Sequence, residues 1–156
     1  MNAMQGKMDF VILAAGYGNR FFSADPSYGH AKQFELLAGR MVLLHSLDKI
    51  SQWPSCGQIV IVLPQDGVEV DILNSLETAA RAATVPVSFT PGGASRSAST
   101  LNGLKALSAL IPNKLVAIHD AARPSVPHQV LNELLSACIS GADGAIPSLP
   151  MTDTVK

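Results

Sequence analysis

The segment Gln58–Leu63 reads QIVIVL, a short β-branched run in which polar and apolar residues do not alternate. A strand of this composition is apolar on both sides, and such strands occur in parallel sheets that helices cover on both faces. Pro64 follows directly and ends the run, because a proline cannot donate to the hydrogen-bond ladder of a sheet. The pattern therefore favours an α/β fold.

Similar runs recur along the chain and alternate with segments of helical period. The predicted strands are Phe10–Ala14, Gln58–Leu63, Pro86–Thr90, Leu115–His119 and the beginning of a fifth at Gly144–Ile146. The predicted helices are Met41–Ile50, Val68–Ala83, Ser97–Leu110 and Pro127–Ile139. This alternation predicts one domain with a mostly parallel sheet between two helix layers, which is a Rossmann-like three-layer α/β sandwich.

Composition narrows the class of protein. The chain has 156 residues, 47% hydrophobic and 15% charged, with a net charge of −1, which suits a compact globular enzyme or binding domain. It lacks the basic excess typical of proteins that bind nucleic-acid polymers, and it contains neither a membrane-length apolar stretch nor a signal peptide. We expect a cytoplasmic protein with no nucleic-acid or membrane partner. The two cysteines and four histidines have no metal-ligand spacing, so we expect reduced thiols and no zinc site.

Ligands in this fold class bind beyond the carboxyl ends of the strands, and the first such segment is Ala14–Phe21, AAGYGNRF. Gly16 and Gly18 allow a tight turn whose N–H groups can surround an anion. A P-loop would need GK[ST], and a dinucleotide loop would need a small residue where Phe21 stands. A triphosphate loop in which Arg20 pairs with phosphate oxygens remains, and the alternative is a structural turn with a solvated arginine.

The other strand ends carry further candidates. Lys32 in HAKQF can reach over bound phosphates, or it is an ordinary surface lysine. In PGGASRSAST a helix cap would explain the serines but would not explain Arg96. Asp120 in AIHDAARPSV can hold Mg²⁺ or a ribose hydroxyl, or it caps a helix. Thr154 and Lys156 follow the last predicted strand in SLPMTDTVK.

Taken in order, these segments resemble the nucleotide-diphospho-sugar transferase superfamily and, within it, the methylerythritol phosphate cytidylyltransferase family. The matching pieces are AAGYGNR, KQF, GGASRSAST with the following NGL, HDAARP and DTVK. The resemblance implies cytidylyl transfer from CTP to 2-C-methyl-D-erythritol 4-phosphate, which gives 4-diphosphocytidyl-2-C-methyl-D-erythritol and pyrophosphate in non-mevalonate isoprenoid biosynthesis. It also implies Mg²⁺ as cofactor and a homodimer joined through a β-arm after the DTVK region.

The resemblance also implies roles for individual residues. Arg20 and Lys32 would be the catalytic cations, and Asp120 the candidate metal ligand unless Mg²⁺ is held through the CTP phosphates. The implied nucleotide-binding residues are Ala14, Ala15, Gly16, Tyr17, Gly18, Asn19, Arg20, Gly93, Arg96, Ser99, Asp120 and Ala121. The implied contacts of the second substrate are Arg123, Thr154 and Lys156. His119 is interpreted as structural.

The resemblance further implies that residues 1–156 form a nucleotidyltransferase domain that stops before the dimerisation arm and the C-terminal segment. We therefore expect the chain alone to bind CTP weakly and not to turn over. Two alternatives remain open. One is a cytidylyltransferase for another polyol phosphate, such as ribitol 5-phosphate, and the other is a nucleotide-binding fragment without turnover.

Overall fold

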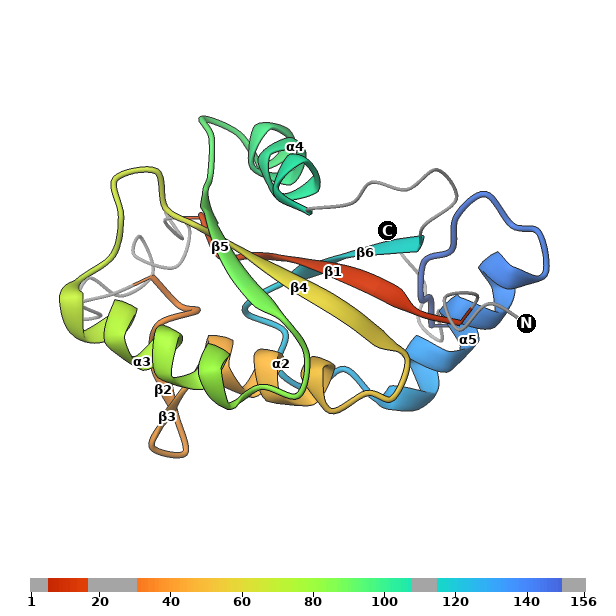
Figure 1. Cartoon of the computed structure of the whole chain (residues 1–156), viewed down its shortest axis with the longest axis horizontal. Coiled ribbons are helices and arrows are strands. Elements are labelled where there is room, and N and C mark those ends of the chain that lie inside the picture. Colours follow the sequence, from red (N-terminus) through yellow and green to blue (C-terminus); the bar gives the residue numbers. More distant parts are fainter. Residues whose placement is uncertain (1–5, 17–30, 108–114, 150–156) are drawn as a thin grey trace, which may run out of the picture.

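The computed structural model of the chain describes residues 6–16, 31–107 and 115–149 (Figure 1). Its main sheet has four parallel strands in the order β5-β4-β1-β6. These strands are β1 (Met8–Leu13), β4 (Cys56–Leu63), β5 (Val87–Pro91) and β6 (Leu115–Asp120). The chain moves outward from β1 through β4 to β5 and returns to the other side of β1 as β6. The strand order thus reverses beside β1, and open α/β sheets bind ligands at such a reversal.

Helices cover both faces of this sheet, so the predicted three-layer α/β sandwich is confirmed (Figure 1). The helices are α2 (Val42–Ser51), α3 (Val70–Ala82), α4 (Arg96–Ala106) and α5 (His128–Ile139). Alternate side chains of β1 point to opposite layers. Phe10 and Ile12 join the core that includes buried residues of α2, α3 and α5. Val11 joins the smaller cluster with Leu104 and Ala106 of α4.

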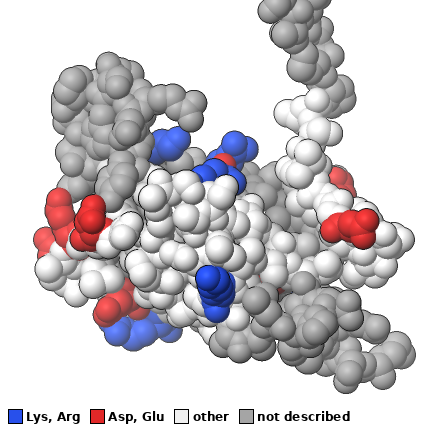
Figure 2. Space-filling view, turned by 90° about the horizontal axis from the view of Figure 1, so that it is seen from above, with Lys and Arg blue, Asp and Glu red and all other residues white. Residues whose placement is uncertain are grey.

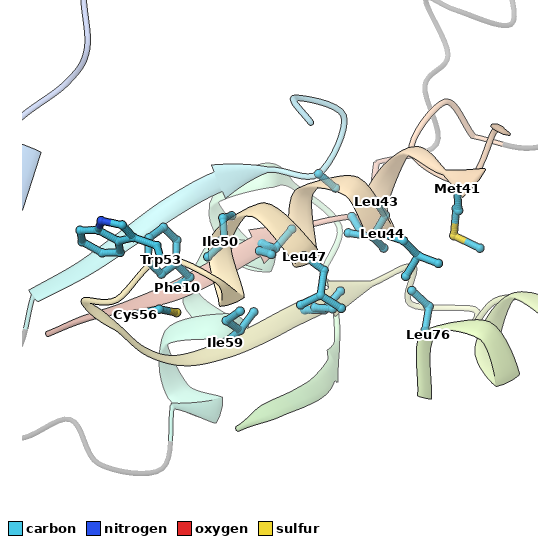
Figure 3. Packing of buried hydrophobic residues seen from close by; sticks show 14 of the residues in the cluster. Phe10, Met41, Leu43, Leu44, Leu47, Ile50, Trp53, Cys56, Ile59 and Leu76 are labelled. Atoms are coloured by element: carbon cyan, nitrogen blue, oxygen red, sulfur yellow. The ribbon is translucent and has the colours of Figure 1, made fainter. Parts of the chain in front are cut away.

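Helix α2 contributes much of the larger core (Figure 3). Its apolar residues recur at helical spacing, and Leu43 and Leu47 are almost completely buried. Trp53 follows the helix and packs edge-on against Phe10, with ring centroids 5.9 Å apart and planes at 87°. The indole N–H of Trp53 donates to Oδ1 of Asn132 in α5 at 2.8 Å. One aromatic side chain therefore ties α2, β1 and α5 together.

The predicted helices and the first four predicted strands form where expected, with most ends shifted by one or two residues. The helix predicted over Ser97–Leu110 ends at Ala106, and residues 108–110 lie outside the described residues. A small antiparallel hairpin, β2 (Leu36–Leu37) with β3 (Arg40–Met41), was not predicted. Its turn places Ala38 and Gly39 at positive φ, which few residues besides glycine adopt readily.

The prediction of a fifth strand at Gly144–Ile146 is wrong. Residues 144–149 adopt no regular secondary structure, and every one of them is exposed. A strand exists through its hydrogen-bonded neighbour, and among the described residues this segment has none. An apolar run such as GAIPSL therefore cannot by itself establish a strand.

Helix α4 lies close to the sheet because Gly103 has no side chain. A Cβ atom at this position would collide with Cγ1 of Val11 and would lie 2.9 Å from Cγ2 of Val62. Both valines are completely buried in strands β1 and β4, so neither can move aside easily. The close contact sets the height of α4 above the sheet.

We predict that Gly103→Leu lowers the free energy of unfolding by roughly 1–3 kcal/mol, the usual cost of inserting side-chain volume into a packed interior. Chemical denaturation followed by circular dichroism would measure the change. Lys105→Leu is the matched control, because Lys105 is exposed on the same helix. Equal stability of the two variants would show that the close approach at Gly103 is not required.

Candidate active site

The carboxyl ends of the strands lie level at one edge of the sheet. Leu13 is paired in register with Asp120 of β6, and the N–H of Ala121 donates to the Leu13 carbonyl at 3.1 Å. On the other side of β1, the N–H of Ala14 donates to the carbonyl of Val62 at 2.8 Å. The segments that follow β1 and β6 therefore leave the sheet side by side, at the point where the strand order reverses.

The glycine pair after β5 brings the second candidate segment against the first. A Cβ atom on Gly92 would lie 2.5 Å from Cβ of Ala15 and 2.9 Å from Oγ of Ser99, so no larger residue fits. The N–H of Gly93 donates to the same Ser99 hydroxyl at 3.0 Å. Ala15 and Gly93, which lie far apart in sequence, thus meet in one small, largely backbone-lined surface, with the buried Ser99 beneath it.

The first turn of α4 uses Ser95 as its cap and does not use the side chain of Arg96. Oγ of Ser95 accepts the N–H of Ala98 at 3.1 Å, so Ser95 is the N-cap of the helix. Asn102, one turn further on, donates from Nδ2 to the carbonyls of Pro91 and Gly92, each at 3.2 Å. Arg96 has no role in the cap and reaches across to the end of β6.

Asp120 lies between two guanidinium groups. Its Oδ1 is 2.8 Å from Nη2 of Arg96, and its Oδ2 is 3.2 Å from Nε of Arg123. Burial alone would raise the pKa of Asp120, but the hydrogen bond and charge of Arg96, together with Arg123 and His119, hold that pKa below its ordinary value. Asp120 is therefore a carboxylate at neutral pH and the shared counter-ion of both arginines.

The prediction that Asp120 is a possible metal ligand stays a prediction. In this structure each of its two carboxylate oxygens contacts one guanidinium group. Within residues 6–16, 31–107 and 115–149, no cluster of three or more His, Cys, Asp or Glu side chains could hold a metal ion.

Cys56 and Cys138 are both free thiols, and burial raises the pKa of the Cys56 thiol to about 12.

His119 has the structural role expected of it. Its Nε2 lies 3.1 Å from the carbonyl oxygen of Arg123, which fits the tautomer with a proton on Nε2. Burial lowers the pKa of His119, and the bond to the Arg123 carbonyl opposes that shift only in part. The His119 ring therefore holds the backbone of the HDAARP turn through its bond to the Arg123 carbonyl.

Residues 31–34, AKQF, contact the start of the glycine loop. Lys32 is exposed, whereas Gln33 is almost completely buried and donates from Nε2 to the carbonyls of Ala14 and Gly16, at 2.7 and 2.8 Å. Sequence analysis did not identify Gln33 as a site residue. Its only signal was its place between a lysine and a phenylalanine, and the loop it contacts lies 17 to 19 positions away.

The structure places many of the predicted site residues at this edge of the sheet. They are Ala14, Ala15, Gly16, Lys32, Gly93, Arg96, Ser99, Asp120, Ala121 and Arg123. Ala121 is buried, and its carbonyl accepts the hydroxyl of Ser46 at 2.9 Å. The remaining predictions, for Tyr17, Gly18, Asn19, Arg20, Thr154 and Lys156, lie outside the described residues.

The charged side chains of the described surface are sparse on the face that α4 covers. Figure 2 shows them there in small separate groups within a largely uncharged surface. A phosphate-bearing ligand on this face would therefore meet individual cations and backbone groups.

None of the described helices has both the length and the apolar character needed to cross a membrane.

The pairing of Asp120 predicts a pH-dependent stability. Because its pKa is lowered on folding, its contribution to stability is complete above the ordinary pKa of 3.8 and is lost as the pH falls through the lowered folded-state pKa. Asp120→Asn should therefore be less stable than wild type at neutral pH, and the difference should shrink in acid. Denaturant unfolding over this pH range measures it, with the exposed Asp143→Asn as control. A difference that stayed constant with pH would contradict the ion pairs.

Comparison with known proteins agrees with this geometry. A bifunctional enzyme IspD/IspF from Rhizobium rhizogenes is 36% identical over 146 residues, which cover 94% of this chain and 34% of that protein. A 2-C-methyl-D-erythritol 4-phosphate cytidylyltransferase from Carboxydothermus hydrogenoformans is 33% identical over 152 residues, covering 96% of this chain and 60% of the relative. The chain thus spans between about a third and three-fifths of the length of these curated relatives.

A solved structure with a closely related name has the same fold as this chain. The crystal structure of a 4-diphosphocytidyl-2C-methyl-D-erythritol synthase superposes with a TM-score of 0.72 at 25% identity, over 96% of this chain and 62% of that one. Residues 8–156 match the family described as IspD: 2-C-methyl-D-erythritol 4-phosphate cytidylyltransferase. Since the match includes every strand of the sheet and the segments that follow them, the chain belongs to the IspD family.

Proposed function

We propose that the protein to which this chain belongs transfers the cytidylyl group of CTP to 2-C-methyl-D-erythritol 4-phosphate. The products would be 4-diphosphocytidyl-2-C-methyl-D-erythritol and pyrophosphate, in non-mevalonate isoprenoid biosynthesis. Family membership supports the reaction. The observation that carries it in the structure is the contact between Ala15 and the Gly92–Ser99 segment beyond the strand ends.

The small surface formed by Ala15 and Gly93, with Ser99 beneath it, suits recognition of a pyrimidine. Ala15 has a short side chain and Gly93 has none, while Ser99 is buried with its hydroxyl bonded to Gly93, so the base would meet mainly backbone N–H and C=O groups. Groups fixed in this way match one ring size and one pattern of donors and acceptors. We propose that they read cytosine and exclude purines by shape, while Asp120 and Ala121 border the ribose.

The reaction needs no covalent enzyme intermediate. A phosphate oxygen of methylerythritol phosphate attacks the α-phosphorus of CTP, a new P–O bond forms in line, and the bond to the leaving pyrophosphate breaks. The protein's contribution is positioning and charge stabilisation. Arg20 and Lys32 would stabilise the negative charge at the α-phosphate, and the N–H groups of the glycine loop would bind the remaining phosphates. Arg123, Thr154 and Lys156 would hold the second substrate.

Magnesium would enter this site with the nucleotide. The described residues contain no group of three or more His, Cys, Asp or Glu side chains that could hold a metal ion, and Asp120 is paired with Arg96 and Arg123. Mg²⁺ commonly binds through substrate phosphates with few protein ligands. We therefore propose that the substrate is the magnesium complex of CTP, and that the cation is held by its phosphate oxygens.

We also propose that the complete protein is a cytoplasmic homodimer that binds neither nucleic-acid polymers nor membranes. The support is the family resemblance and the near-neutral charge of the sequence. Sedimentation of the complete protein would determine its oligomeric state.

Replacing either proposed catalytic cation should reduce turnover strongly. In the complete protein, Arg20→Ala and Lys32→Ala should each lower kcat by about a hundredfold or more, as loss of one preorganised charge contact does. Lys105→Ala is the control, since Lys105 is an exposed lysine on α4. Near-wild-type kcat at saturating CTP for either variant would remove that residue from the catalytic role.

Substrate preference tests the function itself. Calorimetry should show CTP binding in preference to ATP, GTP and NAD, because the loop lacks the features of a P-loop or a dinucleotide site. Pyrophosphate release with CTP should then be faster with methylerythritol phosphate than with ribitol 5-phosphate. Preference for ribitol 5-phosphate would indicate the related polyol enzyme, and tighter binding of NAD than of CTP would exclude a cytidylyltransferase.

A further inference from the structure

The carboxamide of Gln33 makes two bonds at the start of the glycine loop. Both protons of Nε2 are used, one donated to the carbonyl of Ala14 at 2.7 Å and the other to the carbonyl of Gly16 at 2.8 Å. The side chain is 4% exposed, so water does not replace these bonds readily. A single buried group thereby determines where the carbonyls of Ala14 and Gly16, two residues apart, point.

The direction of those carbonyls matters for an anion. In a trans peptide the C=O and the following N–H point in opposite directions, so holding the Ala14 carbonyl toward Gln33 turns the N–H of Ala15 away from it. A loop binds phosphate when its N–H groups face the ligand and its carbonyl oxygens face elsewhere. Gln33 therefore binds the partial negative charges of the Ala14 and Gly16 carbonyls, so these two oxygens face its amide and are not directed at a bound phosphate.

The main chain of Gln33 links the same loop to Lys32. The carbonyl of Gln33 accepts the N–H of Leu43, in the first turn of α2, at 2.9 Å. The N–H of Phe34 donates to the carbonyl of Ala31 at 2.7 Å, which closes the turn that contains Lys32. Gln33 and the first turn of α2 thus fix the distance between the backbone of Lys32 and the start of the glycine loop.

We propose that Gln33 is a positioning residue for nucleotide phosphates: it directs the backbone of residues 14–16, where the glycine loop begins, and places Lys32 beside them. The inference rests on the proposed function, since it names a further residue of the same site. Gln33 would touch neither substrate, and it would act through the loop and the lysine.

Gln33→Met in the complete protein removes both donated bonds while keeping a similar side-chain volume. We expect KM for CTP to rise at least about fivefold and kcat to fall about tenfold or more, the size of effect that two lost hydrogen bonds can produce. KM for methylerythritol phosphate should stay unchanged. A folding defect would only reduce the fraction of active protein, which lowers kcat and moves neither KM.

Two further variants complete the test. Gln129→Met is the matched control, because Gln129 is an exposed carboxamide on α5 that donates to Glu133 at 2.9 Å. Gln33→Asn keeps a buried amide but is one methylene too short to bridge both carbonyls, so it should raise KM for CTP to a smaller extent. If Gln33→Met does not fold, Gln33→Asn decides.

Several outcomes would overturn the proposal: wild-type KM for CTP in the Gln33 variants, an equal rise in both KM values, the same loss in Gln129→Met, or failure of both Gln33 variants to fold. Calorimetric affinity for CTP, compared between variant and wild type, requires no turnover. Wild-type protein that binds CTP but does not act on methylerythritol phosphate would refute the proposed substrate, and the effect of Gln33 on CTP affinity could still be measured.

Discussion

The pairing of β1 with β4 on one side and β6 on the other is the interaction on which the rest of the structure depends. The register sets Leu13 opposite Val62 and opposite Asp120, so the strands end level and their following segments meet. A slip of one residue would turn the valines and isoleucines of a strand to the wrong helix layer. The two apolar faces therefore determine the register, and the register assembles the site.

Small residues allow the parts of the site to come together. Gly103 lets α4 lie directly on Val11 and Val62, and this brings Ser99, one turn earlier, down to the strand ends. Gly92 then has room only for its own backbone between Ala15 and Ser99. The same shortage of space that packs the core thus produces a surface lined by peptide groups, which suits recognition of a base by hydrogen bonds.

Electrostatics at the site are arranged around Asp120. The carboxylate pairs with Arg96 from α4 and with Arg123 from the turn after β6. Its negative charge offsets the repulsion between these two guanidinium groups, which come from different segments. A phosphate that binds either guanidinium would compete with Asp120 for it, because both ligands accept the same kind of hydrogen bond. Asp120 thus holds two cations of the described part of the site close to each other.

The sequence by itself determined the fold class and predicted the segments that lie at the strand ends, because those features depend on local pattern. QIVIVL is apolar on both sides whatever lies next to it. The glycine loop, KQF, GGASRSAST and HDAARP follow one another in the sequence and can be identified without the structure. Tertiary structure decided what depends on a partner distant in sequence. Gly144–Ile146 was predicted to be a strand but has no neighbour in the described sheet. Asp120 contacts two arginines from different segments, and the buried amide of Gln33 binds the carbonyls of Ala14 and Gly16, neither of which the local sequence pattern indicates.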